Sequence, residues 1–141
     1  MRNYLVVANQ TLAGEHLIEE VARRTSSGPS MFHVVVPAAP NREQVTWSEG
    51  EALAIAQQRL DAALQAFRAL GVEVDGEVGD GDPLLAIADA LADRAVDEII
   101  LSTLPPGLSR WLALDLPSKV RARFDIPVTH VIGEAEPVSL D

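Results

Sequence analysis

The chain has 141 residues, of which 48% are hydrophobic, 23% charged and 4% aromatic. This length suits one compact domain over 1–141, and the composition is typical of a folded globular protein rather than a disordered one. The 21 acidic and 11 basic residues give a formal net charge of −10, which opposes general binding to nucleic acid or to an anionic membrane surface.

The absence of cysteine excludes disulfides, cysteine-bound zinc, iron–sulfur clusters and a thiol nucleophile. The first residues run directly into a short apolar segment, without the long apolar region of a signal peptide. No apolar run approaches the ~18 residues of a membrane-spanning helix. We therefore expect a cytoplasmic protein without membrane association.

Short apolar runs alternate with longer segments of helical period along the chain. The first, second and fourth runs are continuously apolar, which is typical of strands covered on both faces. The third run alternates apolar and polar residues and contains Gly76, as expected for a strand nearer an edge. The fifth begins with Pro127, where a missing N–H group matters least. The predicted strands span 4–8, 31–36, 72–78, 98–101 and 127–132.

The longest helical segment covers 48–70. Ser48 and Glu51 form a predicted capping box at its start, where Trp47 is expected to pack against the first turn. Gly71 is expected to end the helix in a left-handed conformation. The apolar stripe that should face the sheet consists of Leu53, Ala56, Leu60, Ala63, Leu64 and Phe67.

Three further helical elements carry their own end signals. Residues 12–24 follow Thr11, a candidate cap. Another helix opens with Asp82 as the N-cap residue and Pro83 in the first helical position. The last element is predicted to divide at Asp115, which is expected to cap its second part. The two parts of this element span 109–112 and 116–124.

The alternation of strands and helices predicts a three-layer α/β fold with a doubly wound, five-stranded parallel sheet. Proline-containing loops follow the second and fourth strands at their carboxyl ends, where such sheets bind ligands. The same residue types also build turns and caps, so both roles remain open for the polar residues at this edge. The candidate pocket comprises Asn9, Gln10, Thr11, Val36, Ser102, Thr103, Gly107, Ser109 and Arg110.

Several strings, in their order and spacing, resemble the universal stress protein family over residues 3–132. The segment 81–87, which begins Gly-Asp-Pro, and the segment 95–100 resemble the family's G-D-P helix and the strand that follows it. The segment 107–112 resembles the family's G-G-L-x-R-x-L string, and 126–128 resembles its C-P-V string. The resemblance implies a sheet order of 3-2-1-4-5 between helical layers.

ATP-binding members of this family resemble G-x2-G-x9-G-[ST], in which backbone N–H groups and a hydroxyl approach the phosphates. The corresponding positions here are Leu101, Leu104, Leu114 and Asp115, and the family's aspartate after the first strand corresponds to Asn9. Leu114 is expected to occupy the volume of a phosphate. A phosphate charge ~4 Å from the Asp115 carboxylate costs about 4 kcal/mol at an effective dielectric constant near 20. The resemblance therefore implies the fold rather than an ATP site, and we expect no cofactor.

The sequence contains no recognisable catalytic constellation. His16, His33 and His130 are dispersed and have no acidic partners at metal-ligand spacing, so structural roles are favoured. No G-x-S-x-G elbow or P-loop lysine occurs, and the sole lysine is Lys119. We expect neither a metal site nor an enzyme active site.

These observations predict a non-enzymatic regulatory or stress-response protein of the universal stress type, acting through an unknown protein partner or a small ligand. An alternative is a nucleotide-binding module that holds ATP or AMP with a rearranged loop from Thr103 to Arg110. A hydrolase or transferase is a third possibility. Because the fifth strand is apolar and is expected at a sheet edge, we also expect a homodimer through Pro127 to Ile132, as the family resemblance implies.

Overall fold

The computed structural model describes residues 1–12, 14–38 and 49–133. Each strand lies within two residues, at either end, of the run predicted from the sequence. The elements are β1 Arg2–Val7, α1 Glu15–Ser26, β2 Ser30–Pro37, α2 Glu49–Ala69, β3 Glu73–Gly79, α3 Pro83–Ala92, β4 Glu98–Thr103, α4 Arg110–Ala113, α5 Leu116–Arg123 and β5 Val128–Ile132.

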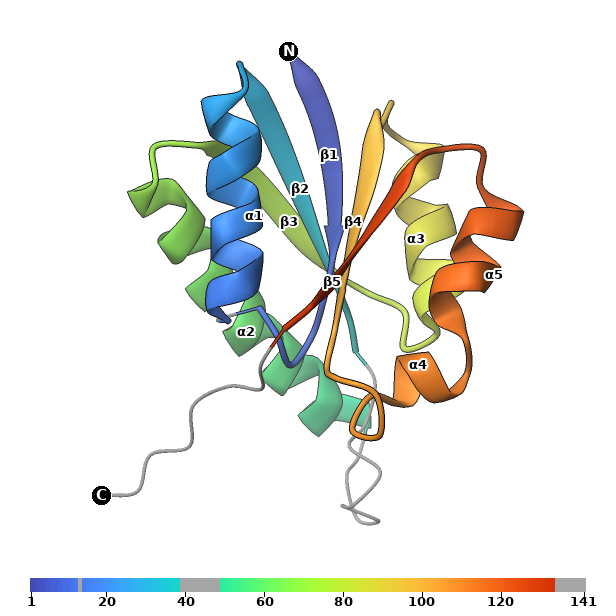
Figure 1. Ribbon diagram of the computed structural model, residues 1–141. Coiled ribbons are helices and arrows are strands. Elements are labelled where there is room, and N and C mark those ends of the chain that lie inside the picture. Colours follow the sequence, from blue (N-terminus) through green and yellow to red (C-terminus); the bar gives the residue numbers. More distant parts are fainter. Residues whose placement is uncertain (13, 39–48, 134–141) are drawn as a thin grey trace.

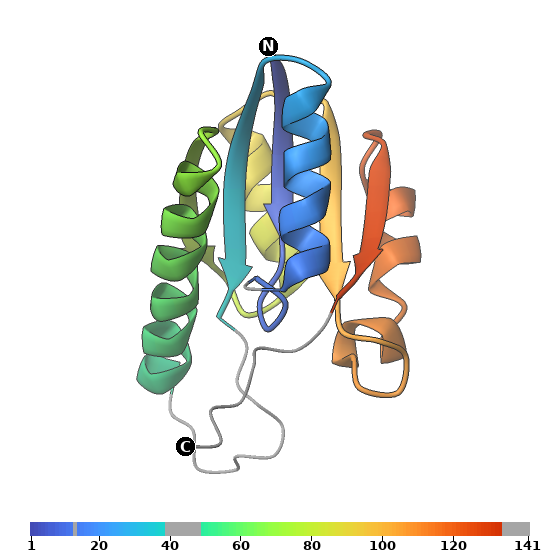
Figure 2. The same ribbon diagram turned by 60° about the vertical axis from the view of Figure 1, so that its left-hand side comes forward.

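All five strands are parallel and pair in the order β3-β2-β1-β4-β5. Helices α1 and α2 cover one face of the sheet, and α3 and α5 cover the other (Figure 1). A second view shows the sheet between its two helical layers (Figure 2). The predicted α/β fold and its sheet order of 3-2-1-4-5 are therefore confirmed.

Strand β1 lies at the centre of the sheet, and both of its faces are buried. Tyr4 and Val6 join the apolar cluster under α1 and α2, whereas Leu5 and Val7 join the cluster under α3 and α5. The Tyr4 ring stacks on Phe32 of β2 with 5.0 Å between the ring centroids. A continuously apolar sequence is required because this strand supplies two cores at once.

Several helix ends follow the predicted local signals. The Asp82 carboxylate accepts a hydrogen bond from the Leu84 N–H at 3.0 Å, and Gly71 after α2 has a φ of 80°. The apolar stripe of α2 is also buried or partly buried, except at Leu53, which is 48% exposed. The first turns of α2 extend past the carboxyl ends of the strands in Figure 1.

Two helix starts differ from the predictions. Helix α1 begins after Gly14 and has no side-chain cap, because the Thr11 hydroxyl is instead hydrogen-bonded to β4. Asp115 precedes α5 with a φ of 55°, and its carboxylate makes no capping hydrogen bond. The predicted cap at Ser48 and the packing of Trp47 lie outside the described residues.

A network of charged side chains lies at the amino end of the sheet. Arg24 of α1 donates to Glu98 of β4 at 2.6 Å and also pairs with Glu20. The Thr129 hydroxyl of β5 donates to Glu98 at 2.5 Å. Burial opposes ionisation of Glu98, but the hydrogen bonds from Thr129 and Arg24 and the charges of Arg24 and Arg2 outweigh it, so the pKa of this carboxyl is lowered. Glu98 thus connects α1 to β5 across β4.

Glu98→Gln is expected to lower the free energy of unfolding by about 2 kcal/mol, because the hydrogen bonds lose their charged acceptor. Folding lowers the pKa of Glu98. The ionised carboxylate therefore adds to the free energy of unfolding above the pKa of the unfolded state, and this stabilisation is lost as pH falls through the pKa of the folded state. The difference between wild type and variant should therefore be constant near pH 7 and shrink below about pH 4.

Urea unfolding at several pH values measures this difference. Glu19→Gln is the matched control, because Glu19 is an exposed carboxylate on the same helix as Arg24. A loss for Glu98→Gln that is the same at every pH would contradict the electrostatic account.

Candidate functional site

The residues expected to contact a ligand gather at the carboxyl edge of the sheet, the lower edge in Figure 1. Asn9, Gln10 and Thr11 lie in the segment that follows β1, and Ser102 and Thr103 end β4. The loop after β4 leads into α4 at the same edge. The structure therefore brings the two predicted groups of residues together, although each side chain has its own surroundings.

The gap between β1 and β4 is the point at which a doubly wound sheet usually opens a ligand crevice. Here the hydroxyls of Thr11 and Ser102 are hydrogen-bonded across the gap at 2.6 Å, and the two residues are 2% and 1% exposed. Buried hydroxyls require partners, and each of these supplies the other's. The crevice position is thus bridged from within the protein.

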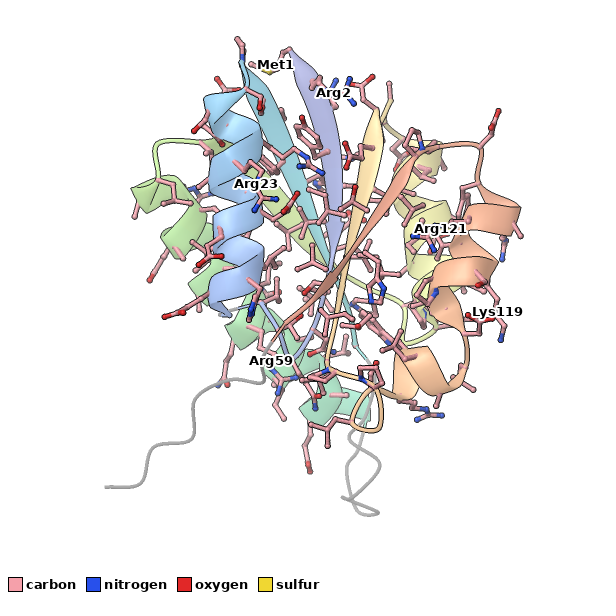
Figure 3. The ribbon with its side chains drawn as sticks, viewed as in Figure 1. Met1, Arg2, Arg23, Arg59, Lys119 and Arg121 are labelled. Carbon is pink, nitrogen blue, oxygen red and sulfur yellow. The ribbon has the colours of Figure 1, made fainter. Side chains whose placement is uncertain are left out.

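Asn9 connects β1 to its other neighbour. The side-chain amide donates to the Pro37 carbonyl of β2 at 2.7 Å, and its oxygen accepts from Arg59 of α2 at 2.5 Å. Figure 3 shows Arg59 at the lower edge, beside the ends of the strands. Sequence reasoning missed Arg59, because an arginine on the polar side of a helix gives no signal that it reaches a neighbouring strand.

Thr103 connects β4 to β5. Its hydroxyl donates to the Leu104 carbonyl at 3.0 Å and lies 2.8 Å from Nε2 of His130. Because a hydroxyl has one proton, that geometry makes the His130 N–H the donor to Thr103. Burial, and next the charge of Arg121, lower the pKa of His130 below its usual value. His130 thus has a hydrogen-bond partner within the protein, and its burial disfavours the charged form.

The other candidates have separate roles. Ser109 is the N-cap residue of α4 and accepts from a backbone N–H of that helix at 3.1 Å. Gly107, with a φ of 90°, allows the turn before α4. Val36 is fully buried in the core under α1 and α2, and Gln10 is half-buried. Arg110 is exposed and presents its charge to solvent.

The residues at the positions that the resemblance aligns with the family's glycine motif lie in different environments. Leu101 is fully buried in the core under α3 and α5, and Leu104 is half-buried. Leu114 is 52% exposed, so its side chain fills no enclosed space. Asp115 is also exposed, and solvent screening weakens the repulsion that its charge exerts on an anion.

Other kinds of site are not formed within 1–12, 14–38 and 49–133. No group of three or more His, Asp or Glu side chains is placed to hold a metal ion. None of the helices in these ranges has the length and apolar character needed to cross a bilayer. Among the described residues, the lining of a surface hollow beside Arg59 comes from α2, through Ile55, Gln58, Arg59 and Ala62.

The element order and the sheet order define the class of fold, a doubly wound parallel α/β sheet, and comparison with solved structures makes it more specific. No protein-family model and no curated protein matches the chain. The structure is similar to a universal stress protein from Archaeoglobus fulgidus, with 16% identity and a TM-score of 0.61 over 93% of this chain and 98% of that chain.

Two further similarities agree with the first. A universal stress protein family protein from Arabidopsis thaliana with AMP bound has 11% identity and a TM-score of 0.62, over 100% of this chain and 97% of that chain. A universal stress protein in complex with cAMP has 14% identity and a TM-score of 0.59, over 93% and 96%. The chain thus has the universal stress protein fold, which confirms the resemblance at the level of structure.

A double-mutant cycle tests the bridge between β1 and β4. Thr11→Val and Ser102→Ala each leave a buried hydroxyl without its partner, which is expected to cost about 1–2 kcal/mol in the free energy of unfolding. The double variant removes both polar groups, so its loss should be smaller than the sum of the single losses. Urea unfolding measures all three, with Ser26→Ala on the exposed side of α1 as the control. Additive losses would contradict the bridge.

Proposed function

We propose that the protein is a cytoplasmic, non-enzymatic regulatory module of the universal stress type that acts through a protein partner or a small ligand and does not hold ATP through a glycine loop. The observation that carries this proposal is the internal pairing at the carboxyl edge. Asn9 is bound to β2, Thr11 to Ser102, and Thr103 to His130. The side chains best placed to bind a nucleotide are therefore already engaged with the protein.

A nucleotide at this edge would have to replace those contacts. A net hydrogen bond contributes about 0.5–1.5 kcal/mol, and a buried group that loses its partner costs about 1–3 kcal/mol. The chain also lacks the glycines that let backbone N–H groups approach phosphates. The paired polar groups oppose binding more than Leu114 and Asp115 do, since both of these residues are exposed.

A second candidate function is an adenine-nucleotide module that uses a rearranged loop from Thr103 to Arg110 and takes ATP or AMP as its ligand. It is favoured by the similar proteins with AMP, cAMP and, for the Archaeoglobus fulgidus protein, dAMP bound. Gly107 would let the backbone turn toward an anion, and the exposed Arg110 would supply a cation.

Calorimetric titration with ATP and AMP distinguishes the two candidates. We expect a dissociation constant for ATP above ~100 μM and the same weak binding in Arg110→Gln. Protein purified without added nucleotide is expected to release no adenine nucleotide in mass spectrometry. Stoichiometric, low-micromolar ATP binding that is lost in Arg110→Gln would overturn the first proposal and favour the second.

We also propose a homodimer through β5. This strand is at the end of the sheet and pairs only with β4 among the described strands. The Pro127 carbonyl and the Gly133 N–H are hydrogen-bonded to β4, so backbone groups of the even-numbered residues between them point outward. An edge with outward backbone groups and the exposed side chain of Ile132 is suited to association with a second copy.

Light scattering after size exclusion is expected to give about twice the chain mass of 15.1 kDa. Ile132→Pro removes an outward N–H group and should shift the protein to a monomer. Ile132→Ala keeps that N–H group and should leave more dimer than Ile132→Pro does. Both variants retain the side-chain contacts of β5 with Thr103 and Glu98. A monomeric wild type at high micromolar concentration would contradict this proposal.

A further inference from the structure

The segment from Thr103 to Phe124, which contains α4 and α5, has a charge opposite to that of the whole chain. It holds four of the 11 Lys and Arg residues but only one of the 21 acidic residues, Asp115. All four cationic residues are exposed, and none forms an ion pair with a residue that the structure describes. They are Arg110, Lys119, Arg121 and Arg123.

The same segment exposes apolar side chains. Leu108 is 72% exposed and Leu114 is 52% exposed, and Trp111 between them is half-buried. Helices α4 and α5 are in contact and lie together on one side of the molecule (Figure 1). Figure 3 shows Lys119 projecting from the outer side of α5, away from the sheet. We use the name α4–α5 face for five exposed residues of this segment, which are Leu108, Arg110, Leu114, Lys119 and Arg123.

Neither property alone would indicate a binding surface, because single exposed leucines and solvated cations are common. Their coincidence is unusual in a chain with a net charge of −10. Cations without an ion pair and exposed leucines, carried by two helices in contact and the loop before them, match a partner surface on which carboxylates flank apolar side chains. Arg and Trp are also enriched among the residues that dominate binding at protein interfaces.

We propose that the α4–α5 face is the docking surface for an acidic segment of a partner protein that presents large apolar side chains between its carboxylates. The inference rests on the proposed function and specifies which surface meets the partner and by what chemistry. The cations orient the segment and hold its carboxylates, while Leu108 and Leu114 are covered by its apolar side chains.

An acidic protein segment fits this face better than an anionic membrane does. A short segment contacts only the face itself. A membrane plane extends beyond the face and would also meet exposed carboxylates such as those of Asp115 and Asp125. The face carries three of the segment's four exposed cations, fewer than the clusters of about 4–8 that bind anionic lipid.

A selection experiment with the full chain provides a defined probe. The immobilised protein is exposed to a library of random peptides about 16 residues long, enough for about four helical turns. We expect the enriched peptides to be acidic and to carry leucine or similar side chains. Their affinity, measured by fluorescence anisotropy, should fall as the salt concentration rises.

Two variants test the face, and each has a matched control. Lys119→Glu combined with Arg123→Glu should weaken the selected peptides about tenfold or more, whereas Arg68→Glu on α2 should not. Leu108→Ser combined with Leu114→Ser should have a similar effect. Leu53→Ser should leave peptide binding unchanged, because Leu53 lies on α2 and is exposed to a degree similar to that of Leu114. Circular dichroism establishes that each variant is folded.

Enriched peptides that are neutral or basic, or that bind the α4–α5 variants as well as wild type, would overturn the proposal. Sedimentation with phosphatidylserine vesicles that requires the same cations, without acidic peptide binding, would assign the face to a membrane instead. ATP titration of the same preparation tests the proposed function separately. Tight ATP binding together with intact peptide binding would overturn the proposed function alone. Weak ATP binding together with no acidic peptide binding would overturn only the docking surface.

Discussion

Burial of β1 on both faces is the constraint on which the rest of the structure depends. Its side chains supply the two apolar clusters in turn, so helices must cover both sides of the sheet. Polar groups that follow so buried a strand must find partners inside the protein. Asn9 finds the Pro37 carbonyl, and Thr11 finds Ser102. The closed carboxyl edge is therefore a consequence of how deeply β1 is buried.

The same reasoning explains how α1 is held. Glu98 and Ser102 lie on the same face of β4, because alternate residues of a strand share a face. Glu98 binds Arg24 near the end of α1, and Ser102 binds Thr11 in the segment that leads into α1. The crossover from β1 to β2 is thus fixed to β4 at both of its ends, by an ion pair at one and a buried hydroxyl pair at the other.

The fold could be predicted from the sequence because its signals are local. Apolar runs of strand length, the Asp82 cap and the Gly71 turn each depend on a few adjacent residues. The roles of Thr11 and Arg59 depend on partners that are 91 and 50 positions away in the sequence. A single sequence places Thr11 at the correct edge, but it does not show whether the hydroxyl caps a helix, contacts a ligand or bonds to another strand.

The positions that the resemblance aligns with the family's glycine motif and the α4–α5 face lie in the same stretch of chain. Leu104 and Leu114 occupy two of those positions, whereas the exposed cations on α4 and α5 remain accessible to a partner. On the docking proposal, the rest of the chain also contributes, because its negative net charge disfavours the approach of an acidic partner elsewhere. Electrostatics would then orient the encounter before any contact forms, and the leucines would determine how long the complex lasts.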